Sequence, residues 1–302
     1  MKKNIIAAIS LCFLLGIACR KEHSNEDTYT SIADFFQKNQ AASQSFSFNN
    51  KDGGVFQTQG GAKVHFPANA FAGDGTVNIS LKEAFSPADM ILNGMPAMSD
   101  KGPLESGGEF YIGATMNGQD AQLAAGKQIQ VDLPATGAGM DSMQVYKGVV
   151  SQDSANPSQK NVTWVANSNA GNNITSTGGT PANPLYSMFA SDIRWVNCDR
   201  VVPGKPVKFG VNNTNIPPAT EVHVFAHFTG YNAAFELHLN TARTQYSSDF
   251  VELPVTIIGI YTKNGQLMAS VESQPVQDMG SCDMHFAPIS TSELKAKLSA
   301  LK

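Results

Sequence analysis

Three histidines lie close together in the chain, and the imidazole side chain of histidine is a common metal ligand. His223 and His227 fall on one predicted strand, and His238 falls on the next, beyond a turn at residues 229–233. Because side chains alternate along a strand, His223 and His227 share one face. The strand between them spans about 13 Å, too far for one zinc ion bound at ~2.0–2.1 Å from each nitrogen. We therefore predict surface histidines, no bound metal and no cofactor, and keep these three as weak metal candidates.

Motifs of conventional enzymes do not occur in this sequence. It has no GxSxG, HExxH or GxxxxGK[ST] segment and no complete EF-hand loop. Two carboxylates that meet at about 5–9.5 Å would suffice for glycoside hydrolysis, and sequence positions do not reveal such a meeting. We therefore expect a non-enzymatic protein and keep a glycan-active hydrolase as the alternative.

Aromatic rings are the other candidate chemistry, because an exposed ring offers a large apolar face to a sugar. Tyr231 falls at a predicted hairpin tip, and Trp164 falls in a short strand with no clear inner face. These two residues are the candidates for ligand stacking. Trp195 stands between Ile193 and Val196, a pattern typical of a core position.

Two of the four cysteines are informative. Cys12 and Cys19 belong to the N-terminal leader region described below, which leaves Cys198 and Cys282 in the body of the chain. An even pair outside the cytoplasm predicts a disulfide, worth roughly 4–5 kcal/mol for a loop of this length. Two buried free thiols are the alternative.

The elements that must position these side chains are mostly strands. Asn117-Gly118 and Asn264-Gly265 each predict a tight hairpin, because both central residues of a type I′ turn need positive φ. A short helix is expected at residues 31–40, and another at 291–301, where Ser290 and Glu293 have capping-box spacing. The expected strands, bounded by Gly, Pro, Asn or Asp, cover residues 62–66, 76–84, 109–116, 121–124, 127–133, 143–150, 161–166, 207–212, 221–229, 234–240, 250–261 and 267–273.

This pattern predicts an all-β protein with two β-sandwich domains, a short N-terminal helix and a C-terminal helix. The expected divisions are residues 1–18 as a leader, 19–45 as tether and helix, and 46–135 as the first sandwich. Residues 136–184 are expected to hold connecting strands and a polar loop, and residues 185–302 the second sandwich with the C-terminal helix.

The N-terminus has the pattern of an exported leader. Lys2 and Lys3 precede an apolar stretch at residues 5–17 that ends at Ala18-Cys19. Cysteine after a small residue resembles the lipobox of bacterial lipoproteins, although Gly16 stands where leucine is most frequent. The resemblance implies lipid attachment at Cys19 and an outer-membrane lipoprotein on the periplasmic or surface face.

Residues 53–134 resemble the opening of ZU5-type β-sandwich domains. The resemblance lies in "GG…GAKVHFPANAF…GTVNISLKE", and the following "MILNGMP…LESGGEFYIGA" is similar to lipoproteins of the Bacteroidetes group. These glycines, prolines and apolar positions imply a fold and carry no catalytic residue.

Charge excludes one class of partner. Without the leader's two lysines, 19 Lys and Arg face 25 Asp and Glu, a net charge of −6, and no basic cluster occurs. We therefore expect no nucleic-acid binding. The leading hypothesis is a lipid-anchored binding, adhesion or scaffold module for an envelope protein or a glycan.

Overall fold

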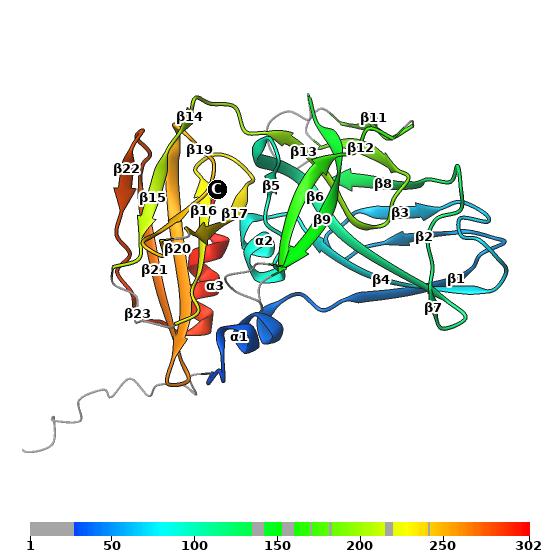
Figure 1. Ribbon diagram of the computed structural model, residues 1–302. Helices are drawn as coiled ribbons and strands as arrows, with labels where there is room; N and C mark the ends of the chain where they lie inside the picture. The colour runs from blue at the N-terminus through cyan, green and yellow to red at the C-terminus, as the bar shows by residue number, and fades with distance from the viewer. Residues whose placement is uncertain are drawn as a thin grey trace, which may run out of the picture.

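The computed structural model describes residues 27–134, 142–152, 160–169, 171–180, 183–214, 220–240 and 242–302. Strands account for 52% of the structure, and the described residues form three short helices. The prediction of an all-β fold is therefore confirmed. Figure 1 shows two β bodies side by side, with helices packed between them.

The first body is a sandwich of two sheets with an apolar core between them. Val64, Phe110, Val131 and Val196 belong to this core, and each is nearly or fully buried. One sheet runs in the order β1 (Gln44–Asn49), β4 (Thr76–Ala84), β6 (Gly102–Met116), β13 (Arg194–Val201), β9 (Gln144–Gln152), β10 (Lys160–Ala166) and β5 (Met98–Ser99), with β7 (Gln119–Asp120) pairing β6. The other runs β11 (Asn173–Thr180), β12 (Asn183–Ala190), β8 (Ile129–Pro134), β3 (Lys63–Phe66) and β2 (Gly54–Gln57).

The second body is built from an eight-stranded sheet and a two-stranded sheet around its own core. Phe228, Phe235 and Phe250 meet in this core, with ring centroids 5.3 to 6.2 Å apart. Its sheet runs β22 (Gly280–Cys282), β15 (Phe209–Asn212), β18 (Gln245–Ser247), β17 (Ala234–Leu239), β16 (His223–Phe228), β20 (Pro254–Lys263), β21 (Gln266–Pro275) and β23 (Ala287–Pro288), beside the pair β14 (Pro206–Val207) and β19 (Phe250–Val251).

Both predicted hairpins are present. Asn117 and Gly118 have φ of 52° and 77°, and Asn264 and Gly265 have φ of 52° and 82°. These left-handed conformations suit asparagine and glycine, and they turn β6 into β7 and β20 into β21. Local turn chemistry therefore fixed these two connections.

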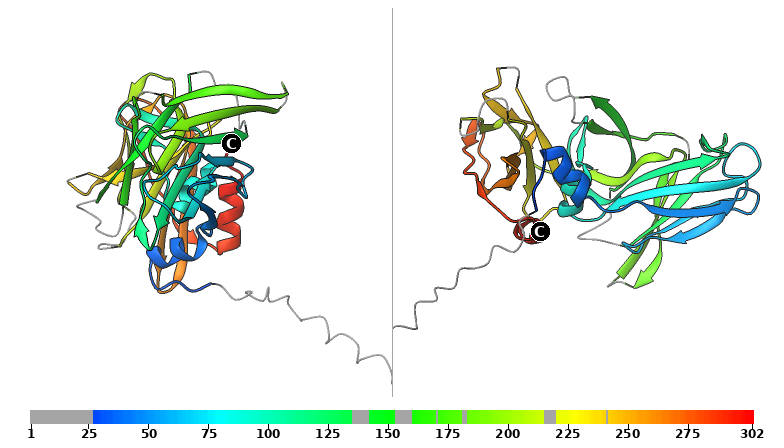
Figure 2. Two further views of the ribbon diagram at one scale, coloured as in Figure 1. Left: turned by 90° about the vertical axis from the view of Figure 1, so that its right-hand side faces the viewer. Right: turned by 90° about the horizontal axis from the view of Figure 1, so that it is seen from below.

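Three helices fill the space between the two bodies. They are α1 (Ile32–Asn39), α2 (Pro87–Asn93) and α3 (Thr291–Ser299). The helices at both ends of the chain match the prediction. The middle helix was not expected, although Ser86 and Asp89 form a complete capping box at its start. Seen from below in Figure 2, α1 and α2 lie between the bodies.

A single apolar cluster joins these helices to both bodies. It contains Phe35 of α1, Met90 of α2, Leu294 of α3, Trp164 of the first body and Ile258 of the second, all fully buried. We call this set, with the other buried residues around it, the junction cluster. Since burial of apolar area is the main favourable term in folding, the two bodies and the helices stabilise one another.

Hydrogen bonds cross the same junction. The Asn232 side chain donates to the backbone oxygens of Phe85, at 3.0 Å, and Ser106, at 2.7 Å. The backbone N–H of Ser106 donates in return to the Asn232 carbonyl at 2.8 Å. The turn after β16 is therefore tied to β6 of the other body.

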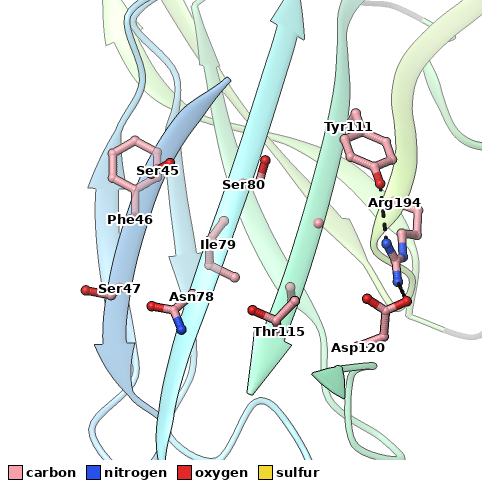
Figure 3. A pocket seen from close by; sticks show the side chains of 12 residues that line it. Ser45, Phe46, Ser47, Asn78, Ile79, Ser80, Tyr111, Thr115, Asp120 and Arg194 are labelled. Atoms are coloured by element: carbon pink, nitrogen blue, oxygen red, sulfur yellow. Dashed lines mark hydrogen bonds and ion pairs between the residues drawn. The ribbon is translucent and has the colours of Figure 1, made fainter. Parts of the chain in front are cut away.

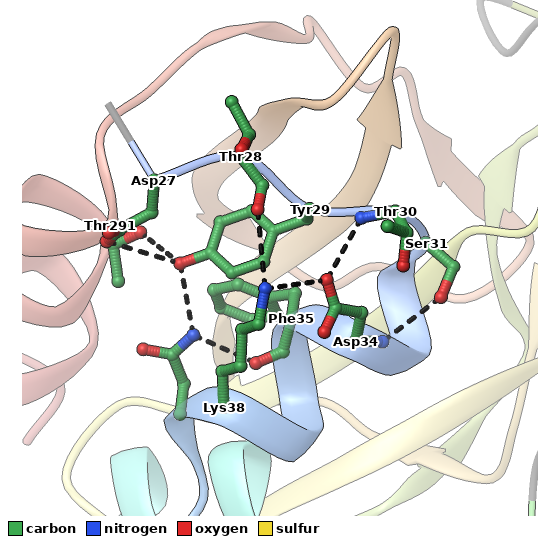
Figure 4. A network of polar contacts seen from close by, with 10 residues as sticks. Asp27, Thr28, Tyr29, Thr30, Ser31, Asp34, Phe35, Lys38 and Thr291 are labelled. Carbon is green, nitrogen blue, oxygen red and sulfur yellow. Dashed lines mark hydrogen bonds and ion pairs between the residues drawn. The ribbon is translucent and has the colours of Figure 1, made fainter. Parts of the chain in front are cut away.

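The segment before α1 docks on the second body (Figure 4). The Tyr29 backbone N–H donates to Gly265 at the hairpin tip, at 3.0 Å, and the Tyr29 hydroxyl lies 2.5 Å from the Thr291 hydroxyl. Lys38 lies over the Tyr29 ring, 5.4 Å from its centroid. The segment before α1 therefore contacts the second body at α3 and at the turn between β20 and β21.

The expected domain divisions differ from the observed strand pairing. The stretch from residue 185 to 200, predicted to open the second sandwich, contains most of β12 and β13, which pair with β8 and β6 of the first body. The predicted polar loop contains β11, which pairs with β12. The second body begins after Val201, because the strands before it close the first sandwich.

The predicted disulfide between Cys198 and Cys282 is wrong, and both cysteines are free and buried. Cys198 packs in the core of the first body, whereas Cys282 packs in the core of the second. A disulfide needs Cα atoms about 4.4–6.8 Å apart, which residues in two separate cores do not provide.

Replacing Phe35 by alanine tests the junction cluster. Phe35 is fully buried, so Phe35→Ala should lower the free energy of unfolding by about 3–5 kcal/mol in urea titrations. Gln37→Ala, an exposed position on the same helix, should change it by less than about 0.5 kcal/mol. A loss for Phe35→Ala as small as that of the control would mean that α1 does not contribute to the core.

Thiol titration tests the free cysteines. Burial raises the pKa of Cys198 well above its usual value and that of Cys282 to about 11. Neither thiol should react with Ellman's reagent at neutral pH in the folded chain from residue 20 onward. In denaturant without reductant, both should react, whereas a disulfide would leave none.

Candidate functional site

A groove lies on the outer face of the larger sheet of the first body (Figure 3). Its volume is about 530 Å³, within the range of about 300–1,000 Å³ that is typical of small-molecule sites. The lining residues come from β1, β4, β6, β7 and the start of β13, and they are Ser45, Phe46, Ser47, Asn78, Ile79, Ser80, Tyr111, Gly113, Ala114, Thr115, Asp120 and Arg194.

Strand alternation places polar groups along the floor of this groove. Ser45 pairs with Ser80 and Ser47 with Asn78 across β1 and β4, and Asn78 pairs with Thr115 across β4 and β6. Their neighbours Phe46, Ile79 and Ala114 pack toward the sandwich core. Because directly paired residues share a face, hydroxyl and amide groups form rows across three strands.

The missing side chain at Gly113 helps to make the groove hollow. Gly113 pairs with Ser80 in the middle of the floor. A Cβ atom added there would lie 3.6 Å or more from its nearest neighbours, which is ordinary contact. A Cβ atom therefore fits at this position, and a larger side chain would extend into the groove.

One end of the groove carries an aromatic ring and an ion pair. Arg194 donates to the Tyr111 hydroxyl at 3.3 Å and to the Asp120 carboxylate at 2.8 Å. The Tyr111 ring packs against Trp195, with centroids 5.0 Å apart. Figure 3 shows Tyr111, Arg194 and Asp120 in a row at this end.

The backbone of Arg194 is in a strained conformation. Its φ is 90°, a region that L-residues with side chains rarely adopt. Such strain persists only where the surrounding structure enforces it, and it concentrates at functional positions. The Arg194 side chain lines the groove, and its neighbour Trp195 is not among the residues with positive φ.

The three candidate histidines have other partners and do not form a metal site. His223 Nδ1 lies 2.7 Å from Glu236 and Nε2 lies 3.5 Å from Glu221. Burial lowers the pKa of His223, but the two glutamates outweigh burial and raise it to about 9. A protonated imidazole has no lone pair for a metal.

The other two histidines have different surroundings. His227 Nδ1 lies 2.9 Å from the Ala233 carbonyl and Nε2 lies 3.2 Å from the Lys302 oxygen. His238 sits on β17 opposite Ser247 of β18. Within the described ranges, no group of three His, Cys, Asp or Glu residues could hold a metal ion.

The two aromatic candidates do not line the groove. Trp164 is fully buried, and its indole N–H donates to the Pro96 carbonyl at 2.8 Å, so this ring cannot stack on a ligand. Tyr231 is partly exposed and packs against the core of the second body. Tyr111, which sequence reasoning missed, is the aromatic residue of the groove. The alternating Ser and Asn positions of β1 and β4 were the one signal for this face.

A second polar cluster is closed off from solvent inside the junction. Glu109 and Asp199 are both fully buried, and Asn197 lies opposite Glu109 and donates to Asp199. Both carboxylate oxygens of Glu109 lack a hydrogen-bond partner among the described residues. Burial, and then the charge of Asp199, raises the pKa of Glu109 well above its usual value. Because the side chains of Glu109, Asn197 and Asp199 are all buried, a substrate has no access to this cluster.

Comparison of the chain with known protein families and with curated proteins finds no match. In the part of the chain that the structure describes, none of the helices combines the length and apolarity needed to cross a bilayer.

Replacing Glu109 by glutamine tests the buried acid. A carboxyl whose pKa is raised by folding keeps its proton after the unfolded chain has lost it, so stability falls as pH rises above about 4.5. Glu109→Gln should make the fall in unfolding free energy between about pH 5 and pH 8 shallower, by up to about 1.4 kcal/mol per pH unit. The half-exposed Glu252 provides the control, since Glu252→Gln should leave the slope unchanged. An unchanged slope in Glu109→Gln would show that Glu109 is ionised in the folded protein.

Proposed function

We propose that this chain is a lipid-anchored envelope protein that binds a glycan, without catalysing a reaction, in the groove of its first body. The observation that carries this proposal is the groove floor, with rows of hydroxyl and amide groups and the Tyr111 ring at one end. Sugars offer the matching surface, because their hydroxyls both donate and accept hydrogen bonds and their C–H faces pack on aromatic rings.

The chemistry of the groove favours a glycan over a peptide. Peptides that add to sheets use free backbone groups at an edge, and amphipathic helices use apolar grooves. This groove lies on the face of paired strands, and five of its side chains are Ser, Thr or Asn: Ser45, Ser47, Asn78, Ser80 and Thr115. A hydroxyl-rich ligand is the best partner for such a surface.

Binding is also favoured over hydrolysis. Glycoside hydrolysis uses two carboxylates about 5–9.5 Å apart, whereas Asp120 is the one carboxylate among the lining residues and is paired with Arg194. The acid pair Glu109 and Asp199 is enclosed in the junction. The groove therefore holds a ligand without the acid and base of a hydrolase.

The envelope location rests on the leader and its resemblance to a lipobox ending at Cys19. Nine residues separate Cys19 from the docked Tyr29, and an extended chain of that length reaches at most about 35 Å. The second body and α3 would then face the outer membrane at short range. As part of this proposal, the segment from β2 to β8 is a ZU5-like domain, on the resemblance of residues 53–134 to that family.

Glycan binding by the chain from residue 20 to 302 tests this function. On a glycan array the protein should bind selectively, and Tyr111→Ala should weaken that binding about tenfold or more through loss of ring contact. Gly113→Val should also block the groove while leaving the unfolding midpoint nearly unchanged.

Tyr231→Ala is the matched control, because this tyrosine lies on the other body and should not affect binding. An array with no binding, together with a specific envelope protein in a pull-down that Tyr111→Ala does not weaken, would exclude the groove as a glycan site.

A further inference from the structure

We infer that the groove selects glycans with an anionic substituent, such as the carboxylate of a uronic acid, and that Arg194 binds this substituent. This inference rests on the proposed glycan binding and adds the class of sugar. It follows from the ion pair and the positive φ of Arg194 at the Tyr111 end of the groove, and from Lys82 on the neighbouring strand.

Arg194 has donors left for a ligand. One N–H of its guanidinium binds Tyr111 and another binds Asp120, and no other partner occurs among the described residues. The side chain is 31% exposed and lines the groove. The planar fork of arginine matches a carboxylate in two-point hydrogen bonding, which is stronger and more directional than a contact to a neutral hydroxyl.

Asp120 occupies the position that a ligand carboxylate would take. It lies on the two-residue strand β7, is 72% exposed and pairs with Arg194. Ion pairs this exposed contribute little to stability, so an incoming anion can replace this carboxylate at small cost. The Asp120–Arg194 pair keeps the guanidinium aligned beside Tyr111 when the groove has no ligand.

A second cationic residue is the cross-strand neighbour of Tyr111. Lys82 pairs with Tyr111 across β4 and β6, and Arg194 reaches Tyr111 from β13 on the other side. The Lys82 amine donates to Gln40, at the end of α1. Lys82 on β4 and Arg194 on β13 thus place two cationic residues on the strands that flank Tyr111, and Arg194 is the one that lines the groove. Two cations on these strands favour negative charge at this end of the groove even though the whole chain is acidic.

The positive φ of Arg194 supports a positioning role for this backbone. Glycine adopts φ near 90° freely, whereas arginine does so at a cost. Among the described non-glycine residues with positive φ, Arg194 is the one whose side chain lines the groove, and backbone strain of this kind concentrates at functional positions. At Arg194 itself β13 pairs with β6, opposite Ile112, whereas its pairing with β9 begins at Val196.

Matched pairs of ligands test the inference. Calorimetry on residues 20–302 would compare acidic oligosaccharides, including oligogalacturonate and oligoalginate, with the same chains after reduction of their carboxyl groups to alcohols. We expect the acidic form to bind about tenfold or more tightly than the reduced form. Raising the NaCl concentration should weaken binding of the acidic form alone, because salt screens exposed charges. Sulfated oligosaccharides form a further arm that separates carboxylate from sulfate recognition.

Three variants assign the effect to Arg194. Arg194→Gly should remove the preference for the acidic form while keeping the fold, because glycine relieves the strained φ. Asp120→Asn should strengthen binding of the acidic form several-fold, since it removes the competing carboxylate. Arg243→Gly is the control: this exposed arginine of the second body also has positive φ, of 56°, and its loss should leave selectivity intact.

The outcomes separate the two proposals. Equal binding of acidic and reduced forms, unaffected by Arg194→Gly, would overturn the inference while leaving glycan binding in place. Absence of binding to every glycan would overturn the proposed function, and the inference with it.

Discussion

The burial of the long strand β6 determines where the groove can form. Other parts of the protein pack on both faces of its first half but on only one face of its second half. From Gly102 to Phe110 every residue is buried, and from Tyr111 onward buried and half-exposed positions alternate. The cover over the first half is the junction cluster, in which three helices and the second body pack against the outer face of the sheet. Where that cover ends, the same face becomes the floor of the groove.

This division explains why two neighbouring positions of one strand behave so differently. Glu109 and Tyr111 point to the same face, two residues apart. Glu109 lies under the cover, where burial and the nearby Asp199 favour its neutral form. Tyr111 lies just outside, where its ring and hydroxyl can meet a ligand. The edge of the junction cluster, rather than the residue types alone, decides which polar group is structural and which is available for binding.

The residues of the groove illustrate how little of a site a linear reading reveals. Ser45, Asn78, Tyr111 and Arg194 are ordinary residues in ordinary strand patterns, and they meet only through the pairing of β1, β4, β6 and β13. The histidines, by contrast, are conspicuous in the sequence, yet His223 is held by two glutamates and His227 by backbone carbonyls. A chemically versatile side chain is evidence of function only when its partners leave it free.

The sequence by itself determined what depends on near neighbours: the all-β class, the two Asn-Gly hairpins, and the terminal helices with serine N-caps at Ser31 and Ser290. Turn conformation, capping and strand alternation involve residues within a few positions of one another, so a short stretch of sequence is enough to predict them. Tertiary structure alone decided the division between the bodies, the separation of Cys198 from Cys282, and the groove. These features depend on pairings such as Glu109 with Asn197, and an alternating strand is compatible with many partners until the whole sheet and its cover are assembled.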